Sequence, residues 1–228
     1  MQVYRLHEKI YHAKFEDQYG MCMTILRIHE HEENPVFKNK IFTFEQYMDW
    51  YVKNMGEGHF NFDKKILGFS IPGTCFRRFI KHFPTDKQTD KEKAFIEMMI
   101  GIAGKEIFEN KDIFSVVATF NRAKSPDFKH EIAHSFYYID EEYRTQVKKL
   151  IRKIDKDVKQ KLSEYIIGLG YLKSEVPDEL NARLSVEKTI ADGGKTLATR
   201  KVMLPFKELL KLTVSKYLDG DKNEEQPK

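Results

Sequence analysis

The chain has 228 residues, of which 41% are hydrophobic and 13% aromatic, and it carries a formal net charge of +4. This composition is enough for a real hydrophobic core, and the near balance of positive and negative side chains gives no sign of a nucleic-acid-binding surface. No run of eighteen apolar residues occurs in the sequence, so we expect no membrane span.

Two further features of the composition bear on where the protein works. The first residues lack the apolar stretch of a signal peptide. Cys22 and Cys75 are the only cysteines, and two widely separated thiols indicate neither a disulfide framework nor a structural zinc site. We therefore expect a cytoplasmic protein with reduced thiols.

The patterns in residues 1–110 predict a mixture of strands and helices. We expect strands at 21–28 and 40–43, a short aromatic helix at 45–53, a turn at 68–73 and helices at 74–83 and 89–102. Thr89 or Asp90 is the expected N-cap of the last of these helices. His29-Glu30-His31-Glu32 is expected to be a solvated charged patch on a strand or loop, and metal binding is the alternative.

A strand followed by a long helix is predicted next. Residues 112–120 are rich in β-branched and aromatic side chains, which favours a strand. After a polar connection, Ser125 or Asp127 can cap a helix that runs without a break from about residue 128 to 154. Its apolar residues recur three or four positions apart and form one stripe: Ile132, Phe136, Ile139, Tyr143, Val147, Leu150 and Ile154.

His130, Glu131 and His134 form the sequence His-Glu-x-x-His on this helix. Residues four apart lie on one face of a helix, so the two imidazoles can bind one zinc ion. Glu131 then lies at the flank of the metal, where it can take a proton from a zinc-bound water. A chance match or a solvated histidine pair is the alternative. The pair lies nearly opposite the apolar stripe, however, which favours a site over core packing.

A catalytic zinc needs a third protein ligand. Asp140 and Glu141 follow the motif, but if the helix continues past them they lie too far along its axis, Asp140 by about 9 Å. Glu179 lies in the first turn of a second helix that begins near Pro177, and the small Ala182 one turn later allows close packing. We therefore expect Glu179 to be the third ligand. The alternative is an ordinary acid that favours the helix dipole.

The strand, the His-Glu-x-x-His helix and the later Glu-x-x-Ala sequence together resemble the zincin superfamily of metallopeptidases, and Glu-x-x-Ala looks like its gluzincin branch. The resemblance covers about residues 112 to 190. It implies a zinc ion held by His130, His134 and Glu179, with Glu131 as general base. We accordingly expect an α+β, helix-rich fold with a small twisted sheet before the active-site helix.

The function implied by the resemblance is zinc-dependent hydrolysis of peptide bonds in a peptide or protein substrate. The alternative is a non-catalytic zinc-binding protein, regulatory or interacting, that keeps the scaffold. Residues 1–110 are expected to form an N-terminal α/β part and 111–218 the catalytic part of one compact unit. Within the latter we expect further helices at 158–169 and 204–218 and a loop at 192–195, with a disordered tail at 219–228.

Overall fold

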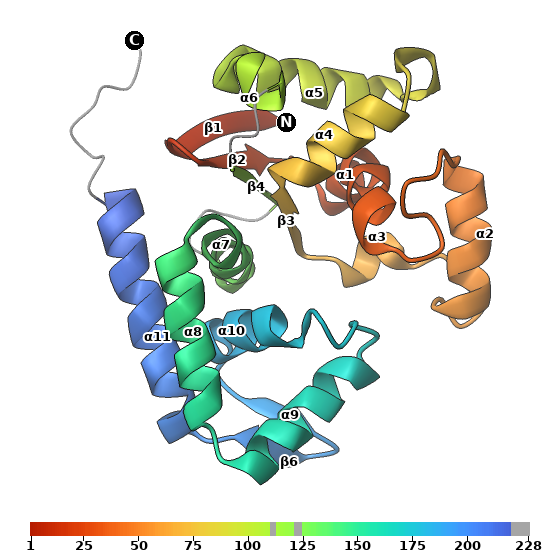
Figure 1. The fold of residues 1–228 in the computed structure, drawn as a ribbon. Helices are drawn as coiled ribbons and strands as arrows, with labels where there is room; N and C mark the ends of the chain where they lie inside the picture. Colours follow the sequence, from red (N-terminus) through yellow and green to blue (C-terminus); the bar gives the residue numbers. More distant parts are fainter. Residues whose placement is uncertain (110–112, 121–124, 220–228) are drawn as a thin grey trace. The chain divides into compact units, whose positions relative to one another are not determined.

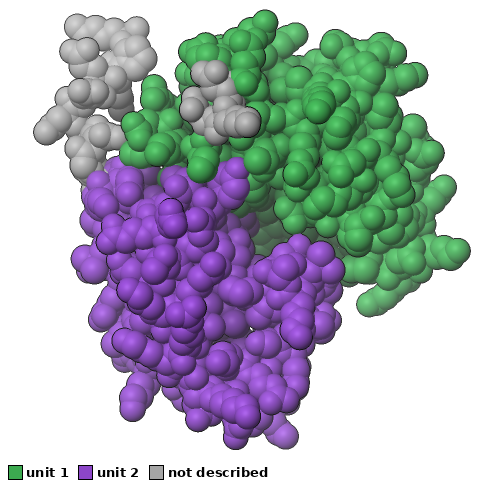
Figure 2. All heavy atoms as spheres, in the orientation of Figure 1, with its two compact units in different colours: residues 1–123 green, residues 124–228 purple. Residues whose placement is uncertain are grey.

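The structure, a computed structural model, describes residues 1–109, 113–120 and 125–219 (Figure 1). The chain divides into two compact units, Met1–Ala123 and Lys124–Lys228 (Figure 2). The fold is mixed α+β and rich in helix, as expected. Of the tail predicted at 219–228, Asp219 ends a π-helical turn, and residues 220–228 lie outside the described residues. Among the described residues, none of the helices has the length and apolar character needed to cross a membrane.

The first unit contains a four-stranded sheet in the order β1-β2-β4-β3. Its strands are β1 (Gln2–His7), β2 (Ile10–Lys14), β3 (Gly68–Pro72) and β4 (Ser115–Thr119). The β2–β4 pair is parallel, and the β1–β2 and β3–β4 pairs are antiparallel. All five residues of β4 are buried, in accord with the strand predicted at 112–120. That strand belongs to the first unit.

The turn predicted at 68–73 is wrong, because Gly68–Pro72 forms the edge strand β3. Glycine and proline at its ends resemble turn signals in the sequence. Proline removes a backbone donor, but at the end of an edge strand this loss is tolerated. The strand is joined to its neighbour by side chains as well, since the hydroxyl oxygens of Ser70 and Ser115 lie 3.4 Å apart.

Helices surround this sheet in the first unit. They are α1 (Gln18–Glu33), α2 (Phe44–Asn54), α3 (Phe62–Lys65), α4 (Gly73–His82), the 3-10 turn η1 (Thr85–Lys87), α5 (Asp90–Ala103) and α6 (Glu106–Glu109). The helices expected at 45–53, 74–83 and 89–102 are confirmed as α2, α4 and α5. Thr89 caps α5 by accepting a hydrogen bond from the Glu92 backbone N–H at 3.3 Å.

The strands expected at 21–28 and 40–43 are wrong. Residues 21–28 lie inside α1, and residues 40–43 form no strand. Met21, Ile25 and Ile28 are all fully buried, and their separations of four and three residues fit one face of a helix. Asp17 begins the helix by accepting a hydrogen bond from the Gly20 backbone N–H. An apolar run of eight residues does not by itself distinguish these two structures.

His31 corrects the expectation of a solvated patch at residues 29–32. The segment lies on α1, and His31 is 0% exposed. Its Nδ1 lies 3.0 Å from the Lys40 carbonyl oxygen, which can only accept, so Nδ1 carries the hydrogen. Nε2 of His31 therefore accepts from Nδ1 of His82 at 2.9 Å. Burial lowers the pKa of His31, so this residue is a neutral structural link between α1 and α4.

Residues 125–219, the described part of the second unit, form helices and one hairpin. Its elements are α7 (Pro126–Ile139), α8 (Glu141–Lys153), α9 (Lys156–Gly168), α10 (Val176–Val186), β5 (Ile190–Asp192), β6 (Lys195–Ala198), α11 (Arg200–Val214) and the π-helical turn η2 (Ser215–Asp219). The loop expected at 192–195 is the hairpin turn, in which Gly193 and Gly194 take positive φ angles of 52° and 79°.

The unbroken helix predicted from 128 to 154 is wrong, because it ends at Ile139 and a new helix begins at Glu141. Asp140 between them has an extended backbone, and its Oδ1 accepts from the Tyr143 backbone N–H at 3.0 Å. An aspartate competes with helical hydrogen bonding in this way and so caps the second helix. The apolar stripe survives the break, since Phe136 and Val147 are both fully buried.

Candidate metal centre

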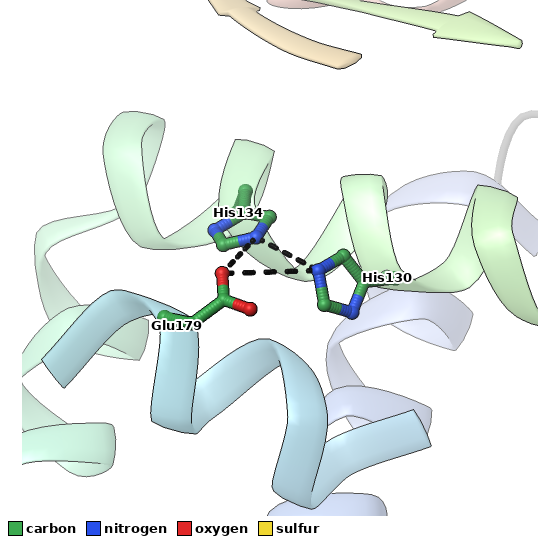
Figure 3. A group of neighbouring side chains, drawn as sticks. All are labelled: His130, His134 and Glu179. Atoms are coloured by element: carbon green, nitrogen blue, oxygen red, sulfur yellow. Dashed lines mark hydrogen bonds and ion pairs between the residues drawn. The ribbon is translucent and has the colours of Figure 1, made fainter. Parts of the chain in front are cut away.

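The start of α7 positions the two histidines of the motif. Ser125 caps the helix by accepting a hydrogen bond from the Phe128 backbone N–H at 3.1 Å, and Pro126 occupies its first turn. His130 and His134 follow one turn apart on one face. Their ring centroids lie 4.8 Å apart and their Nε2 atoms 3.1 Å apart (Figure 3). Both side chains are half-buried.

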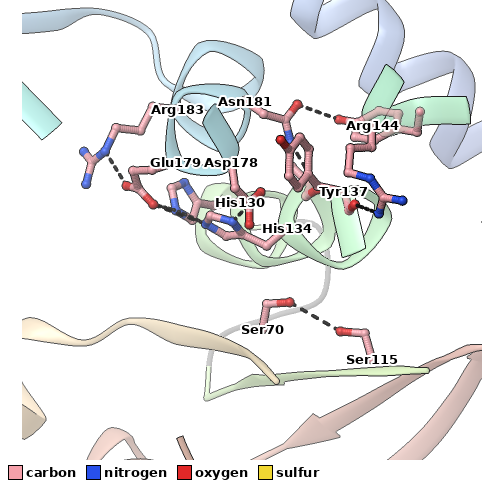
Figure 4. Close-up of polar contacts among 12 residues, drawn as sticks. Ser70, Ser115, His130, His134, Tyr137, Arg144, Asp178, Glu179, Asn181 and Arg183 are labelled. Carbon is pink, nitrogen blue, oxygen red and sulfur yellow. Dashed lines mark hydrogen bonds and ion pairs between the residues drawn. The ribbon is translucent and has the colours of Figure 1, made fainter. Parts of the chain in front are cut away.

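Helix α10 packs against α7 and brings Glu179 to the histidines. The Asn181 amide, which is fully buried, donates to the Ala133 carbonyl oxygen at 3.2 Å, and its oxygen accepts from the Tyr143 hydroxyl at 2.9 Å (Figure 4). Ala182 is also fully buried. These contacts fix the register of α10 on α7 and α8. They leave Glu179 only 2% exposed.

The ligand atoms of the three predicted residues converge (Figure 3). Glu179 Oε2 lies 3.4 Å from His134 Nε2 and 3.9 Å from His130 Nε2. A tetrahedral zinc with bonds of about 2.0–2.2 Å holds its ligand atoms about 3.3–3.6 Å apart. The separation of 3.4 Å lies within that range, and those of 3.1 Å and 3.9 Å lie slightly below and above it. The triangle of ligand atoms is thus close in size to one face of a tetrahedral zinc site. The group could therefore hold a metal ion.

Asp178 supports His134 from the other side of its ring. Its Oδ1 lies 2.9 Å from His134 Nδ1, while Nε2 of the same ring approaches Glu179. A carboxylate beside one ring nitrogen orients a histidine and leaves the other nitrogen to a metal. The sequence carries no signal for this role of Asp178 beyond its place after Pro177 in the first turn of a helix, because the role depends on how α10 packs against α7.

The electrostatics of the group favour an anionic Glu179 beside two imidazoles whose pKa values are shifted in opposite directions. Burial and the charge of His134 lower the pKa of His130 to about 3. Burial opposes the charged form of His134, but the carboxylates of Asp178 and Glu179 outweigh it and raise its pKa well above the ordinary value. Burial also opposes ionisation of Glu179, yet the hydrogen bond from His134 and the nearby positive charges lower its pKa to about 2. A bound metal would take the place of the His134 proton.

Glu131, the predicted general base, lies on α7 directly after His130 and is half-buried. Its surroundings include Tyr171, on the connection between α9 and α10. Burial raises the pKa of Tyr171, and the carboxylates of Glu179 and Glu131 raise it further. The two carboxylates therefore lie close enough to act on one phenol. Glu131 is not itself one of the converging ligands.

Asp140 and Glu141 lie outside the converging group, but the reason expected from the sequence does not hold. They do not sit further along one helix, because α7 ends before them. Asp140 is instead used as a cap, and its second carboxylate oxygen accepts from the Tyr217 hydroxyl at 3.0 Å. Glu141 is exposed in the first turn of α8.

Comparison of the chain with protein-family models, with curated proteins and with solved structures gave no match.

Proposed function

We propose that this protein is a zinc-dependent peptidase, with His130, His134 and Glu179 as zinc ligands and Glu131 as general base. The observation that supports this proposal is the convergence of two imidazole nitrogens and one carboxylate oxygen from α7 and α10. Two histidines and one glutamate are a ligand set of catalytic zinc, which keeps a further position open.

The charges of the ligand residues suit a divalent cation. Glu179 is anionic and buried, so it contributes a full negative charge without having to lose a proton at neutral pH. When bound, zinc supplies a Lewis acid that polarises a carbonyl and lowers the pKa of water to about 7. Asp178 holds the ring of His134 in the orientation that directs Nε2 to the ion.

Glu131 moves the proton in the proposed reaction. Its carboxylate accepts a proton from the water whose oxygen bonds to the carbonyl carbon of the peptide. As the bond between that carbon and the peptide nitrogen breaks, Glu131 delivers the proton to the leaving nitrogen. One water is consumed, and a carboxylic acid and an amine are formed; the proton of the acid passes to the amine, so the products leave as a carboxylate and an ammonium ion. The half-buried position of Glu131, next in sequence to a ligand, suits this role.

The decisive experiment replaces the base and leaves the ligands unchanged. Wild type and Glu131→Gln are loaded to equal zinc occupancy and incubated with a peptide library, and the products are read by mass spectrometry. We expect Glu131→Gln to retain zinc and lose about 10²–10⁴-fold in turnover. Glu141→Gln, at an exposed glutamate outside the group, is the matched control and should cleave like wild type.

Two outcomes would contradict the proposal. Equal turnover by wild type and Glu131→Gln would remove Glu131 as base. Zinc-loaded wild type without turnover of any peptide would favour a zinc-binding protein that regulates or binds others through the same scaffold.

A further inference from the structure

Arg183 lies between two carboxylates on α10. Its Nε is 2.5 Å from Glu179 Oε1, and its NH1 is 2.8 Å from Glu187 Oε1 (Figure 4 shows the first of these contacts). The three residues are spaced four apart, with Glu187 directly after the end of α10, so they form a row of negative, positive and negative charge along one side of the helix. Glu179 is thus engaged on two sides, by Arg183 and by the histidines.

The position of Arg183 is well defined. Its side chain is 18% exposed, and its guanidinium carbon lies 5.9 Å from the centre of the Tyr165 ring on α9. The guanidinium group presents its donors in a rigid planar fork, so two carboxylates bound at once leave little freedom. Burial opposes its charge, but the carboxylates of Glu179 and Glu187 outweigh burial and raise the pKa of Arg183.

The consequence concerns the two oxygens of Glu179. Oε1 accepts from Arg183, while Oε2 is the oxygen that approaches the two imidazoles. On the basis of the proposed metal centre, we infer that Arg183 is a positioning residue that makes Glu179 a ligand through one oxygen only. The coordination positions that the second oxygen would fill thereby stay open for water and substrate.

This arrangement matters because both oxygens of a free carboxylate can bind the same metal ion. A catalytic zinc site needs an open position beside its three protein ligands. If Glu179 were free to turn, its Oε1 would compete with water for that position. Arg183 prevents this turn by holding Oε1 in a charge-assisted hydrogen bond.

The test uses cobalt(II) in place of zinc in the full-length protein. The visible absorption of cobalt(II) weakens as the coordination number of the ion rises, so the spectrum reports how many ligand atoms bind it. The variants are Arg183→Met, which removes the donor, and Arg183→Lys, which keeps a charged donor four residues from Glu179. We expect both to bind one cobalt. Arg183→Met should show clearly weaker absorption than wild type, and Arg183→Lys should restore the wild-type spectrum.

Two further variants make the result independent of any single substitution. Glu187→Gln leaves Arg183 on Glu179 and should keep the wild-type spectrum. Arg183→Met combined with Glu187→Gln also removes the half-buried carboxylate that has lost its partner, and it should show the same weak absorption as Arg183→Met. Circular dichroism checks that each variant folds.

The outcomes separate this inference from the proposed function. Wild type that binds no stoichiometric cobalt would overturn the metal centre itself, and the role of Arg183 with it. A wild type that binds cobalt, with an unchanged spectrum both in Arg183→Met and in Arg183→Met combined with Glu187→Gln, would overturn the inference alone. Weak absorption in Arg183→Lys as well as Arg183→Met would show that charge and a single donor do not hold Oε1, and would also contradict it.

Discussion

Asp178 Oδ1 lies 2.9 Å from Nδ1 of His134, whereas Glu179 approaches the other nitrogen of the same ring, Nε2. Asp178 is about one-third exposed, whereas its neighbour Glu179 is almost fully buried. Two carboxylates that are adjacent in the sequence of one helix thus contact the two different nitrogens of one imidazole. In the proposed metal centre Glu179 would bind the metal directly, whereas Asp178 would orient the ligand His134.

We predict that Asp178→Asn weakens zinc binding without abolishing it. Asparagine keeps an oxygen of similar size beside Nδ1, but the negative charge that orients the ring and strengthens its basicity is gone. Loss of such an outer partner typically costs about 10–100-fold in metal affinity. Competition with a chelator of known affinity measures the change. Asp192→Asn, in the exposed hairpin, is the control, and equal affinities of the two variants would argue against a role for Asp178.

His130→Ala should remove stoichiometric zinc. One of three protein ligands is lost, and the affinity should fall by orders of magnitude. Alanine is the best helix former, so α7 should persist. Metal analysis after gel filtration reads the result, and His59→Ala, at an exposed histidine of the first unit, is the control. One zinc per chain surviving in His130→Ala would refute the assignment of the site.

Asp140→Ala should destabilise the second unit by about 1–2 kcal/mol, because the variant loses the cap of α8 and a side-chain hydrogen bond. The two carboxylate oxygens accept from the Tyr143 backbone N–H and from the Tyr217 hydroxyl. Tyr217→Phe removes only the second of these bonds and should cost less. Urea unfolding followed by circular dichroism measures both. A fully stable Asp140→Ala would mean that the break between α7 and α8 does not depend on this cap.

The stability of the first unit should fall in mild acid because of His12. This residue is 2% exposed, and its Nε2 lies 2.9 Å from Thr119 Oγ1. Burial, and then the charge of Lys14, lower the pKa of His12 from 6.5 to about 4. Between these two values the unfolded chain binds more protons than the folded chain, so the free energy of unfolding falls as the pH falls from 6.5 to 4.

The full effect of His12 is about 3 kcal/mol, and it is absent above pH 6.5. Urea unfolding of wild type and His12→Gln at a series of pH values isolates it, since all other titrations are shared by the two proteins. The single tryptophan, Trp50, reports on the first unit. A chelator keeps the second unit free of metal. Parallel pH dependence in both proteins would rule out His12 as the source.

Some features of this protein could be predicted from the sequence because they depend on local spacing. A separation of four residues puts His130 and His134 on one face of any helix that contains them. The Thr89 side chain caps α5 by accepting a hydrogen bond from the backbone N–H of Glu92, only three residues later. The fully buried strand β4 was predicted from its β-branched residues. In each case the decisive atoms lie within a few residues of each other along the chain.

Other features depend on contacts between distant segments, and the sequence predicted them wrongly or not at all. The apolar residues 21–28 suit a strand as well as a helix, and only their packing within the first unit selects α1. Residues 68–72 form the strand β3 because they pair with β4, which lies more than forty residues later in the chain. Glu179 could be named as a candidate ligand from the sequence, but its approach to the histidines depends on the Asn181–Ala133 contact between α10 and α7. Asp178 acquires its position beside His134 from that same packing, because the partner of a side chain on a neighbouring helix is set by how the two helices pack and not by spacing along the chain. The contact between Arg183 and Glu179 follows instead from their separation of four residues on α10.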